Sequence, residues 1–313
     1  MSILGIEKKS LRKAYGETLV DIGKENKNIV VLDADLSCST QTQIFADAFS
    51  RRFFNSGRAE QDMMATAAGL ASQGKIPFVS TFAMFATGRT YDQIRNSVAY
   101  PKFNVKIVAT HGGITVGEDG ASHQALEDVA LMRNIPNMMV IVPADYKEVE
   151  EVIKFVAIHK GPCYVRIPRT NLPDIFDNNY KFSLDAIEIR KGTDFTIITN
   201  GETLAQSIKA SELLEKQNIE LQIIHCPVVK PVPSNLLSLI TTKNVITIEN
   251  HSIIGGLGSV VAEQIAESSL NVQFKRIGIN DEFGQSGTAK ELLDFYGLSA
   301  NKIIEVIKEN YNK

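Results

Sequence analysis

Three observations predict an α/β fold made of two doubly wound domains. Short apolar runs rich in β-branched residues alternate with segments of helical periodicity along the chain. This alternation is typical of parallel sheets that carry helices on both faces. It stops once, in a stretch rich in Pro, Asn and Asp, and a length of 313 residues suits two domains. We therefore expect a first domain at 1–175, a linker at 176–192 and a second domain at 193–313.

The first domain is expected to hold buried strands connected by helices. The expected strands are 29–33, 76–82, 105–110, 138–142 and 163–167, and the expected helices are 7–26, 60–74, 121–133 and 145–159. In the first helix, Leu11, Tyr15 and Leu19 recur at the four-residue spacing that gathers side chains on one helix face. The strand segments carry β-branched residues and lie between helical segments, which indicates burial within a parallel sheet.

The second domain repeats this alternation after the break. The expected strands are 194–200, 220–226, 243–249 and 272–279, and the expected helices are 201–217 and 256–268, with further helices to the end of the chain. Two α/β domains in sequence are therefore the predicted architecture.

The composition favours a cytoplasmic globular protein. Hydrophobic residues make up 44% and charged residues 22% of the chain. A net charge of −3, without a long Lys/Arg run, argues against nucleic acid as the partner. No apolar stretch reaches the roughly 18 residues of a membrane span, so we expect no membrane partner. Three scattered cysteines without a CxxC pair are consistent with a reducing cytosol.

Three unusual stretches, 57–61, 80–85 and 111–123, follow or border expected strands of the first domain. Ligands of doubly wound sheets gather at the carboxyl ends of strands. The third stretch places two His, two acidic residues and four Gly within 13 residues. Glycine carries an entropic cost on folding, and its use is to let the backbone pass close to a ligand. The alternative is a glycine-rich turn with a helix-capping Asp119.

Taken together, the motifs resemble the C-terminal half of transketolase, in its separate-subunit form. The matching segments are Ala34–Leu36, Arg58–Gln61, Ser80–Phe85, His111–His123 and Arg169–Pro173, followed in the second domain by Glu249–Gly258. The resemblance covers nearly the whole chain in order. It implies a thiamine-diphosphate-binding fold of the pyrimidine type, followed by a domain of the transketolase C-terminal type.

The same resemblance implies a partner subunit. The family holds the cofactor's diphosphate and a divalent cation with a Gly-Asp-Gly and a later Asn, and no Gly-Asp-Gly occurs in this sequence. The segment Gly117–Gly120 differs because Glu separates the first Gly from Asp. We therefore expect an N-terminal transketolase subunit to hold thiamine diphosphate by its diphosphate and to hold Mg²⁺ or another divalent cation. No metal ligand is expected in this chain.

The resemblance assigns the cofactor-binding residues. Glu60 matches the family's activating glutamate, which hydrogen-bonds the ring nitrogen N1′ of the aminopyrimidine. Phe82 and Phe85 match the aromatic wall around that ring, and Asp35 belongs to the matching cofactor-binding positions. The alternatives are a Glu that favours the helix dipole and ordinary core aromatics. Gly88 stands where the family often has a tyrosine.

His111 and His123 match catalytic residues that also contact the sugar, and Asp119 matches a further sugar-binding position. Imidazoles can relay protons to a carbonyl and to hydroxyls. The alternatives are a satisfied buried histidine for His111 and a turn-forming role for Asp119.

Arg12, Ser39 and Arg169 match the family's phosphate-anchoring positions. Arginine forks bind phosphate oxygens in pairs. A solvated surface role is the alternative for Arg12, which lies in a basic helix start. Arg58 has no expected role, and the glycine cluster at 255–258 is more typical of helix packing than of a phosphate site.

The expected function is that of a transketolase subunit, active only with its partner, which moves a two-carbon ketol unit from a ketose phosphate to an aldose phosphate. Two subunits of each kind are expected in a heterotetramer. The open alternatives are a deoxyxylulose-phosphate synthase, a 2-oxoacid dehydrogenase β-type subunit and a split transketolase for an unusual sugar. A non-catalytic scaffold subunit is the alternative from another class.

Overall fold

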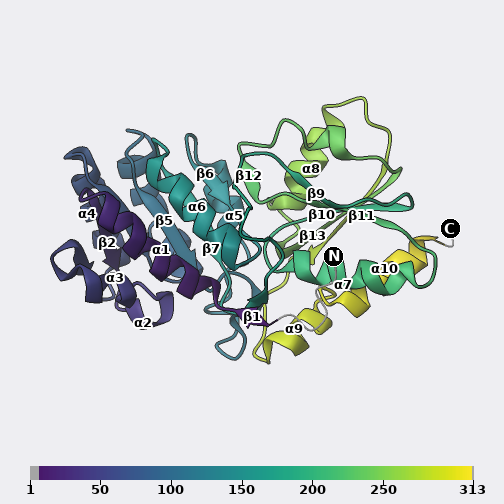
Figure 1. Ribbon diagram of the computed structural model, residues 1–313, viewed down its shortest axis with the longest axis horizontal. Coiled ribbons are helices and arrows are strands. Elements are labelled where there is room, and N and C mark those ends of the chain that lie inside the picture. The colour runs from purple at the N-terminus through teal and green to yellow at the C-terminus, as the bar shows by residue number, and fades with distance from the viewer. Residues whose placement is uncertain (1–6, 312–313) are drawn as a thin grey trace.

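The computed structural model describes residues 7–311 as two α/β domains that lie side by side, each with a sheet between helical layers (Figure 1). The first sheet has the order β12-β6-β7-β5-β4-β2-β3. Its strands are β2 (Ile29–Asp33), β3 (Phe53–Asn55), β4 (Ile76–Ser80), β5 (Lys106–Thr110), β6 (Met139–Ile141), β7 (Cys163–Ile167) and β12 (Val228–Lys230). All of its pairs are parallel except β6 with β12. The expected strands of this domain are confirmed.

Helices cover both faces of the first sheet. One core contains side chains of α1 (Leu11–Glu25), α3 (Gln43–Ala48) and α6 (Tyr146–Ile158), and the other contains side chains of α4 (Glu60–Ser72), α5 (Asp128–Asn134) and the π-helical segment η3 (Gln93–Ala99). Short turns complete this domain: α2 (Ser37–Thr40), η1 (Ser50–Arg52), the π-helical η2 (Phe85–Arg89) and η4 (Ile114–Val116). Leu11, Tyr15 and Leu19 are at most 1% exposed, which confirms the predicted face of α1.

Two helix predictions need correction. Helix α1 begins at Leu11 rather than at residue 7, because β1 (Lys8–Lys9) pairs antiparallel with β8 (Leu172–Pro173). The helix expected at 121–133 is wrong over 121–127, where turns precede α5. There the Gln124 side-chain amide donates to the carbonyls of Ile114, Gly117 and Gln285, which holds the loop folded back on itself.

The second sheet has the order β14-β13-β10-β11-β9. Its strands are β9 (Ile187–Arg190), β10 (Phe195–Thr199), β11 (Leu221–His225), β13 (Asn244–Ser252) and β14 (Gln273–Ile279). One face packs against α7 (Thr203–Glu215), α9 (Ala289–Phe295) and α10 (Ala300–Tyr311), and the other packs against α8 (Leu257–Ala266) and lies near η5 (Leu237–Leu239). Only β9 is antiparallel to its neighbour. Strand β9 of the second sheet falls within the segment 176–192 that was expected to be the linker. The exact boundaries of the linker stay a prediction.

The two domains share buried polar contacts. Strand β12 follows β11 in the chain yet joins the first sheet beside β6 (Figure 1). Arg166 of β7 pairs with Asp128 at 2.8 Å and also donates to the carbonyl of Asn250 at 2.9 Å. His225 of β11 bonds Glu148 of α6 at 2.9 Å, and both side chains are fully buried. These bonds fix the second domain against the first.

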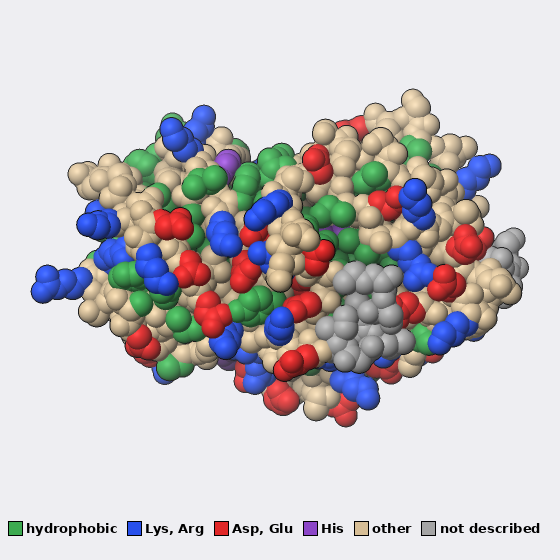
Figure 2. Space-filling model, viewed as in Figure 1, with side chains coloured by type: hydrophobic (Ala, Val, Ile, Leu, Met, Phe, Trp, Pro, Cys, Tyr) green, Lys and Arg blue, Asp and Glu red, His purple; other side chains and the backbone are tan. Residues whose placement is uncertain are grey.

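The described surface shows no strong separation of charge on the face drawn in Figure 2, where basic and acidic side chains are intermixed over both domains. None of the helices within residues 7–311 combines the length and the apolar character needed to span a membrane.

Candidate active site

Several of the expected site residues lie together at the carboxyl ends of the parallel strands of the first sheet. Phe82 follows β4 and His111 follows β5, and these strands are neighbours in the sheet. A bridge between Phe82 and Thr110 continues the pairing by which the two strands bring their following residues together. Glu60 is the first residue of α4, which follows β3 after the short loop 56–59. The topology therefore gathers motifs that lie 50 residues apart in the sequence.

An aromatic cluster forms at this edge. The rings of Phe82 and His111 stack with centroids 3.8 Å apart and an interplanar angle of 24°. Phe85 stacks beside Phe82 at 5.9 Å, and His123 meets Phe85 edge-on at 5.3 Å. Aromatic and imidazole planes thus line one side of the site, which suits a flat ring as ligand.

His111 is held in a strained and buried position. Its backbone has φ 60, in the left-handed region that side chains rarely adopt. Its Nδ1 lies 2.8 Å from the Thr110 hydroxyl. Burial, with the positive charges of Arg12 and Arg169 nearby, lowers the pKa of His111 to about 3. The imidazole is therefore neutral at physiological pH and can accept or donate a proton in a hydrogen bond.

Arg12 and Arg169 both lie near His111, since their charges act on it. Arg12 donates to the main-chain carbonyl of Ser39 at 2.8 Å. Burial and the charge of Arg169 lower the pKa of Arg12. Arg169 donates to the carbonyl of Val116 and lies 3.1 Å from the Glu118 carboxylate. Two guanidinium groups within electrostatic reach of a neutral imidazole are suited to an anionic group such as a phosphate.

Glu60 lines a cavity of about 490 Å³ together with the other residues of 58–62 and Arg89. The residue is only 5% exposed, and its Oε1 accepts a hydrogen bond from Arg89 Nη1 at 2.8 Å. The Arg89 guanidinium also lies 4.0 Å from the centroid of the Phe85 ring. Arg89 was not among the residues expected from the sequence. The sequence feature that could have indicated it is a positively charged residue directly after Gly88, at the end of a segment of mostly aromatic and small residues, 82–88.

Two expected residues lie at the margin of the site. Asp35 is exposed, with φ 63, and pairs with Arg58 at 3.5 Å. This contact gives Arg58 a partner, although exposed ion pairs contribute little to stability. Asp119 is exposed, and its side chain makes no hydrogen bond or ion pair with another described residue between 7 and 311. The structure does not bring either side chain into the aromatic cluster.

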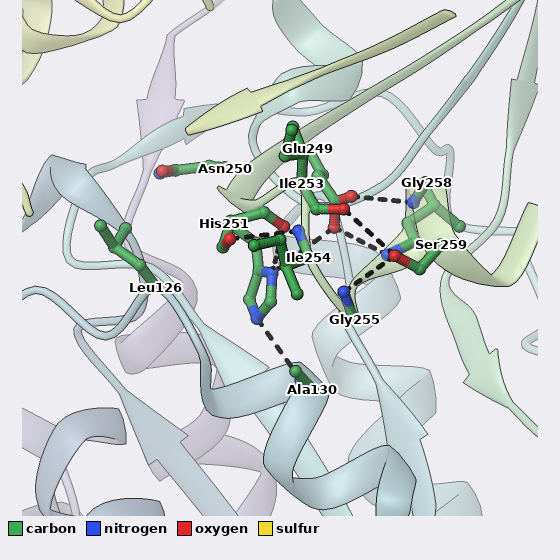
Figure 3. A network of polar contacts seen from close by, with 12 residues as sticks. Leu126, Ala130, Glu249, Asn250, His251, Ile253, Ile254, Gly255, Gly258 and Ser259 are labelled. Carbon is green, nitrogen blue, oxygen red and sulfur yellow. Dashed lines mark hydrogen bonds and ion pairs between the residues drawn. The ribbon is translucent and has the colours of Figure 1, made fainter. Parts of the chain in front are cut away.

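The glycine cluster of the second domain packs a helix. Glu249 accepts hydrogen bonds from the backbone N–H groups of Leu257 at 2.7 Å and Gly258 at 2.8 Å, at the start of α8 (Figure 3). A Cβ on Gly256 would lie 2.0 Å from the Glu249 carboxylate. The amides that an anion would need are already bonded, so this motif is structural.

His251, two residues further along β13, joins the domains. Its Nδ1 donates to the carbonyl of Ser252 at 2.7 Å, and its Nε2 accepts from the backbone N–H of Ala130 in α5 at 3.4 Å (Figure 3). The Nε2 contact packs the second domain against the first, whereas the Nδ1 contact stays within β13. Within residues 7–311, no group of three or more His, Cys, Asp or Glu side chains has the arrangement of a metal site.

The fold and the order of these motifs define a class of protein. The family model for the transketolase pyrimidine-binding domain matches residues 7–174, and the model for the transketolase C-terminal domain matches residues 185–303. The chain belongs to the transketolase family, whose members depend on thiamine diphosphate.

Individual relatives are similar over nearly their full length. A Methanocaldococcus jannaschii protein, provisionally described as a transketolase C-terminal section, is 52% identical over 308 residues, with 97% of each chain covered. A Clostridium protein described as a 6-deoxy-6-sulfo-D-fructose transketolase subunit is 38% identical, with 97% of this chain and 95% of that protein covered. A solved chain described as a split gene transketolase, inactive beta4 tetramer, has a TM-score of 0.88 at 44% identity, with 98% of this chain and 99% of that chain covered.

Proposed function

We propose that this chain is the subunit of a split transketolase that binds the pyrimidine half of thiamine diphosphate and transfers a two-carbon ketol unit between sugar phosphates. One observation carries the proposal. The buried Glu60 carboxylate borders a cavity that Arg89 also lines, and the Arg89 guanidinium lies 4.0 Å from the centroid of the Phe85 ring, which stacks on Phe82. An aminopyrimidine ring needs both a carboxyl group in its plane and an apolar face to stack on.

The residues present fit this cofactor. Phe85 offers a ring face, and Glu60 Oε2 accepts no hydrogen bond from the other described residues of 7–311, so it remains available as an acceptor. When bound, thiamine diphosphate supplies the carbanion chemistry that breaks and forms carbon–carbon bonds. Glu60 would hydrogen-bond the ring nitrogen and share a proton with it. Asp35, at the exposed rim, would contribute to cofactor binding.

The other site residues would act on the sugar. The neutral His111 and the partly exposed His123 would move protons at the donor's carbonyl and hydroxyl oxygens. Asp119, which is unpaired within the described residues and exposed, would accept a hydrogen bond from a sugar hydroxyl. His111 and His123 belong to the aromatic cluster, where the reacting carbons of the sugar would meet the cofactor, and Asp119 would act from the margin of the site.

Arg12, Arg169 and Ser39 would bind the substrate's terminal anion. The positive charges of Arg12 and Arg169 both act on His111, and Arg12 donates a hydrogen bond to the Ser39 carbonyl. Because one relative is described as acting on a 6-deoxy-6-sulfo sugar, a sulfonate is a second candidate for this anion. Comparison of sugar phosphates, sugar sulfonates and free sugars as donors would identify which group the site prefers.

The partner is proposed to be an N-terminal transketolase subunit that holds the cofactor's diphosphate and Mg²⁺ or another divalent cation. The sequence lacks the family's Gly-Asp-Gly, and one relative is described as a C-terminal section. The solved relative is described as an inactive tetramer of β chains. Two copies of each subunit would form a heterotetramer, since closed twofold assemblies are the commonest kind. A cytoplasmic location remains part of this proposal.

The test is reconstitution. The purified chain, with thiamine diphosphate and Mg²⁺, is expected to show no ketol transfer, and co-expression with its partner is expected to restore it. Light scattering on the co-purified pair is expected to give two copies of each chain. Robust turnover by the chain alone would contradict the division of the site between subunits.

A further inference from the structure

Arg89 makes contacts that the proposed function leaves unexplained. Its guanidinium donates to Glu60 Oε1 at 2.8 Å and lies 4.0 Å from the centroid of the Phe85 ring. Both contacts are with residues assigned above to the aminopyrimidine. A guanidinium is flat, carries N–H donors and stacks on aromatic faces. Those are also the properties by which an aminopyrimidine would bind Glu60 and Phe85.

We propose that the Arg89 guanidinium occupies the place of the aminopyrimidine in the cofactor-free subunit and leaves when the cofactor binds. This inference rests on the proposed role of Glu60 in cofactor binding. The stand-in has a physical purpose, because a buried carboxylate without a partner is costly. Arg89 satisfies Glu60 until the cofactor ring replaces it.

The geometry permits such an exchange. The Arg89 side chain is 52% exposed, whereas the Glu60 side chain is 6% exposed, so the guanidinium reaches inward from solvent. The cavity of about 490 Å³ that both residues line leaves room for the side chain to swing. The backbone can stay in place, because the Arg89 carbonyl accepts a hydrogen bond from Gln61 Nε2 at 2.9 Å.

The local backbone supports the same conclusion. Arg89 ends η2, a π-helical turn, and such turns occur often at functional sites. The preceding residue is Gly88, where a Cβ would meet only the flexible tip of Met84 at 3.4 Å. No side chain at position 88 therefore obstructs movement of the Arg89 side chain along this edge of the pocket.

The consequence is competition between Arg89 and the cofactor. Removal of the guanidinium is expected to tighten thiamine diphosphate binding by roughly tenfold, because a partly exposed ion pair and a cation–π contact no longer have to be broken. The same change is expected to lower the melting temperature of the cofactor-free subunit, since Glu60 then lacks its partner. A residue that contacts the cofactor directly would have the opposite effect on cofactor affinity.

The experiment uses the co-purified complex with its partner and measures thiamine diphosphate binding by calorimetry at fixed Mg²⁺. Arg89→Met keeps the apolar stem and removes the charge, and Arg89→Gln serves as a second variant if the first fails to fold. Arg95→Met is the matched control, because Arg95 lies on the next π-helical segment and bonds only its neighbour Asn96. We expect tighter binding in both Arg89 variants and unchanged binding in the control.

Unchanged or weaker cofactor binding in both Arg89 variants would overturn this inference while leaving the proposed function intact. Failure of the wild-type complex to bind thiamine diphosphate would instead overturn the proposed function, and this inference with it. A lowered melting temperature of the isolated Arg89→Met subunit, without cofactor or partner, is the independent readout that supports the role of Arg89 as a stand-in.

Discussion

Glu60 begins α4, and Glu249 of β13 lies against the start of α8; both carboxylates are buried, but they differ in what they bind. Their exposures are similar, at 5% and 3%. Glu249 accepts hydrogen bonds from two backbone N–H groups at the start of α8, and these donors are fixed in the helix. Glu60 is the first residue of α4 and binds a single side chain, Arg89, that is half exposed. One carboxylate is committed to its helix, and the other can change its partner.

This difference in partners distinguishes a structural glutamate from a candidate catalytic glutamate. The sequence motifs and the degree of burial do not distinguish them. Both glutamates lie in motifs that resemble the same family, and both are nearly inaccessible. The partner decides the role, because backbone amides fixed in a helix cannot move aside for a ligand. Burial also raises the pKa of Glu249, which its bonds to Leu257 and Gly258 and the nearby charge of His251 partly counteract.

The substitution Glu60→Gln is expected to have the largest effect among the tests of this difference between Glu60 and Glu249. The variant is expected to lose about 10²- to 10⁴-fold in turnover of the reconstituted complex, because a general acid–base group typically contributes that much. Its unfolding midpoint is expected to stay near wild type, since an amide can still accept from Arg89. Glu215→Gln, which breaks an ion pair between the end of α7 and Arg190 of β9, is the matched control for both measurements. Turnover within tenfold of wild type would show that Glu60 is another structural acid.

The reciprocal change is Glu249→Ala, which is expected to cost about 2–6 kcal/mol in the free energy of unfolding. Two N–H groups at the start of α8 lose their acceptor, and each unsatisfied buried group costs about 1–3 kcal/mol. Chemical denaturation would measure the loss, and turnover per folded complex is expected to remain near wild type. A stable variant with lost turnover would reverse the roles assigned to the two glutamates.

Arg169 extends the comparison to a side chain that has a hydrogen-bond partner within the protein but is also open to solvent. It donates to the carbonyl of Val116, yet 40% of the side chain is exposed. Arg169→Ala is expected to lower kcat/KM for a sugar phosphate by roughly tenfold to a hundredfold, since a charge-assisted hydrogen bond is worth about 1.5–3 kcal/mol. The same assay with the free sugar is the internal control. An equal loss for both donors would mean that Arg169 acts only on the Val116 loop.

The sequence was sufficient for features that depend on local pattern. The strands β2, β4 and β5 follow from apolar runs with β-branched residues, and Glu60 lies where the expected helix begins. The stacking of Phe82 on His111 also follows once β4 and β5 are neighbours in a parallel sheet.

Features that depend on distant partners could not be predicted. Strand β12 has three residues and forms only because β6 offers an edge. The segment 121–127 is not helical because Gln124 bonds three carbonyls, one of them in the second domain. The contact between Arg89 and Glu60 spans 29 residues and depends on the π-helical turn that ends at Arg89. No local periodicity carries information of this kind.

The smallest expected effect concerns the protonation of His111 as the pH is lowered. The folded-state pKa of His111 is lowered to about 3, whereas an unfolded histidine titrates near 6.5. Between these values the unfolded chain binds more protons than the folded chain, so this group's contribution to stability is present above pH 6.5 and is lost as pH falls toward 3. Asp145 has the opposite influence, because burial raises its pKa to about 6 and its ionisation destabilises the fold as pH rises from about 4 to 6.

The useful quantity is therefore the difference between wild type and His111→Gln, measured by chemical denaturation at pH 7 and pH 5. Wild type is expected to lose about 1–2 kcal/mol more than the variant over this interval, since a full proton difference is worth about 1.4 kcal/mol per pH unit. Equal losses in the two proteins would mean that the imidazole takes up its proton in the folded site, and the neutral His111 assigned to the proposed proton transfer would be wrong.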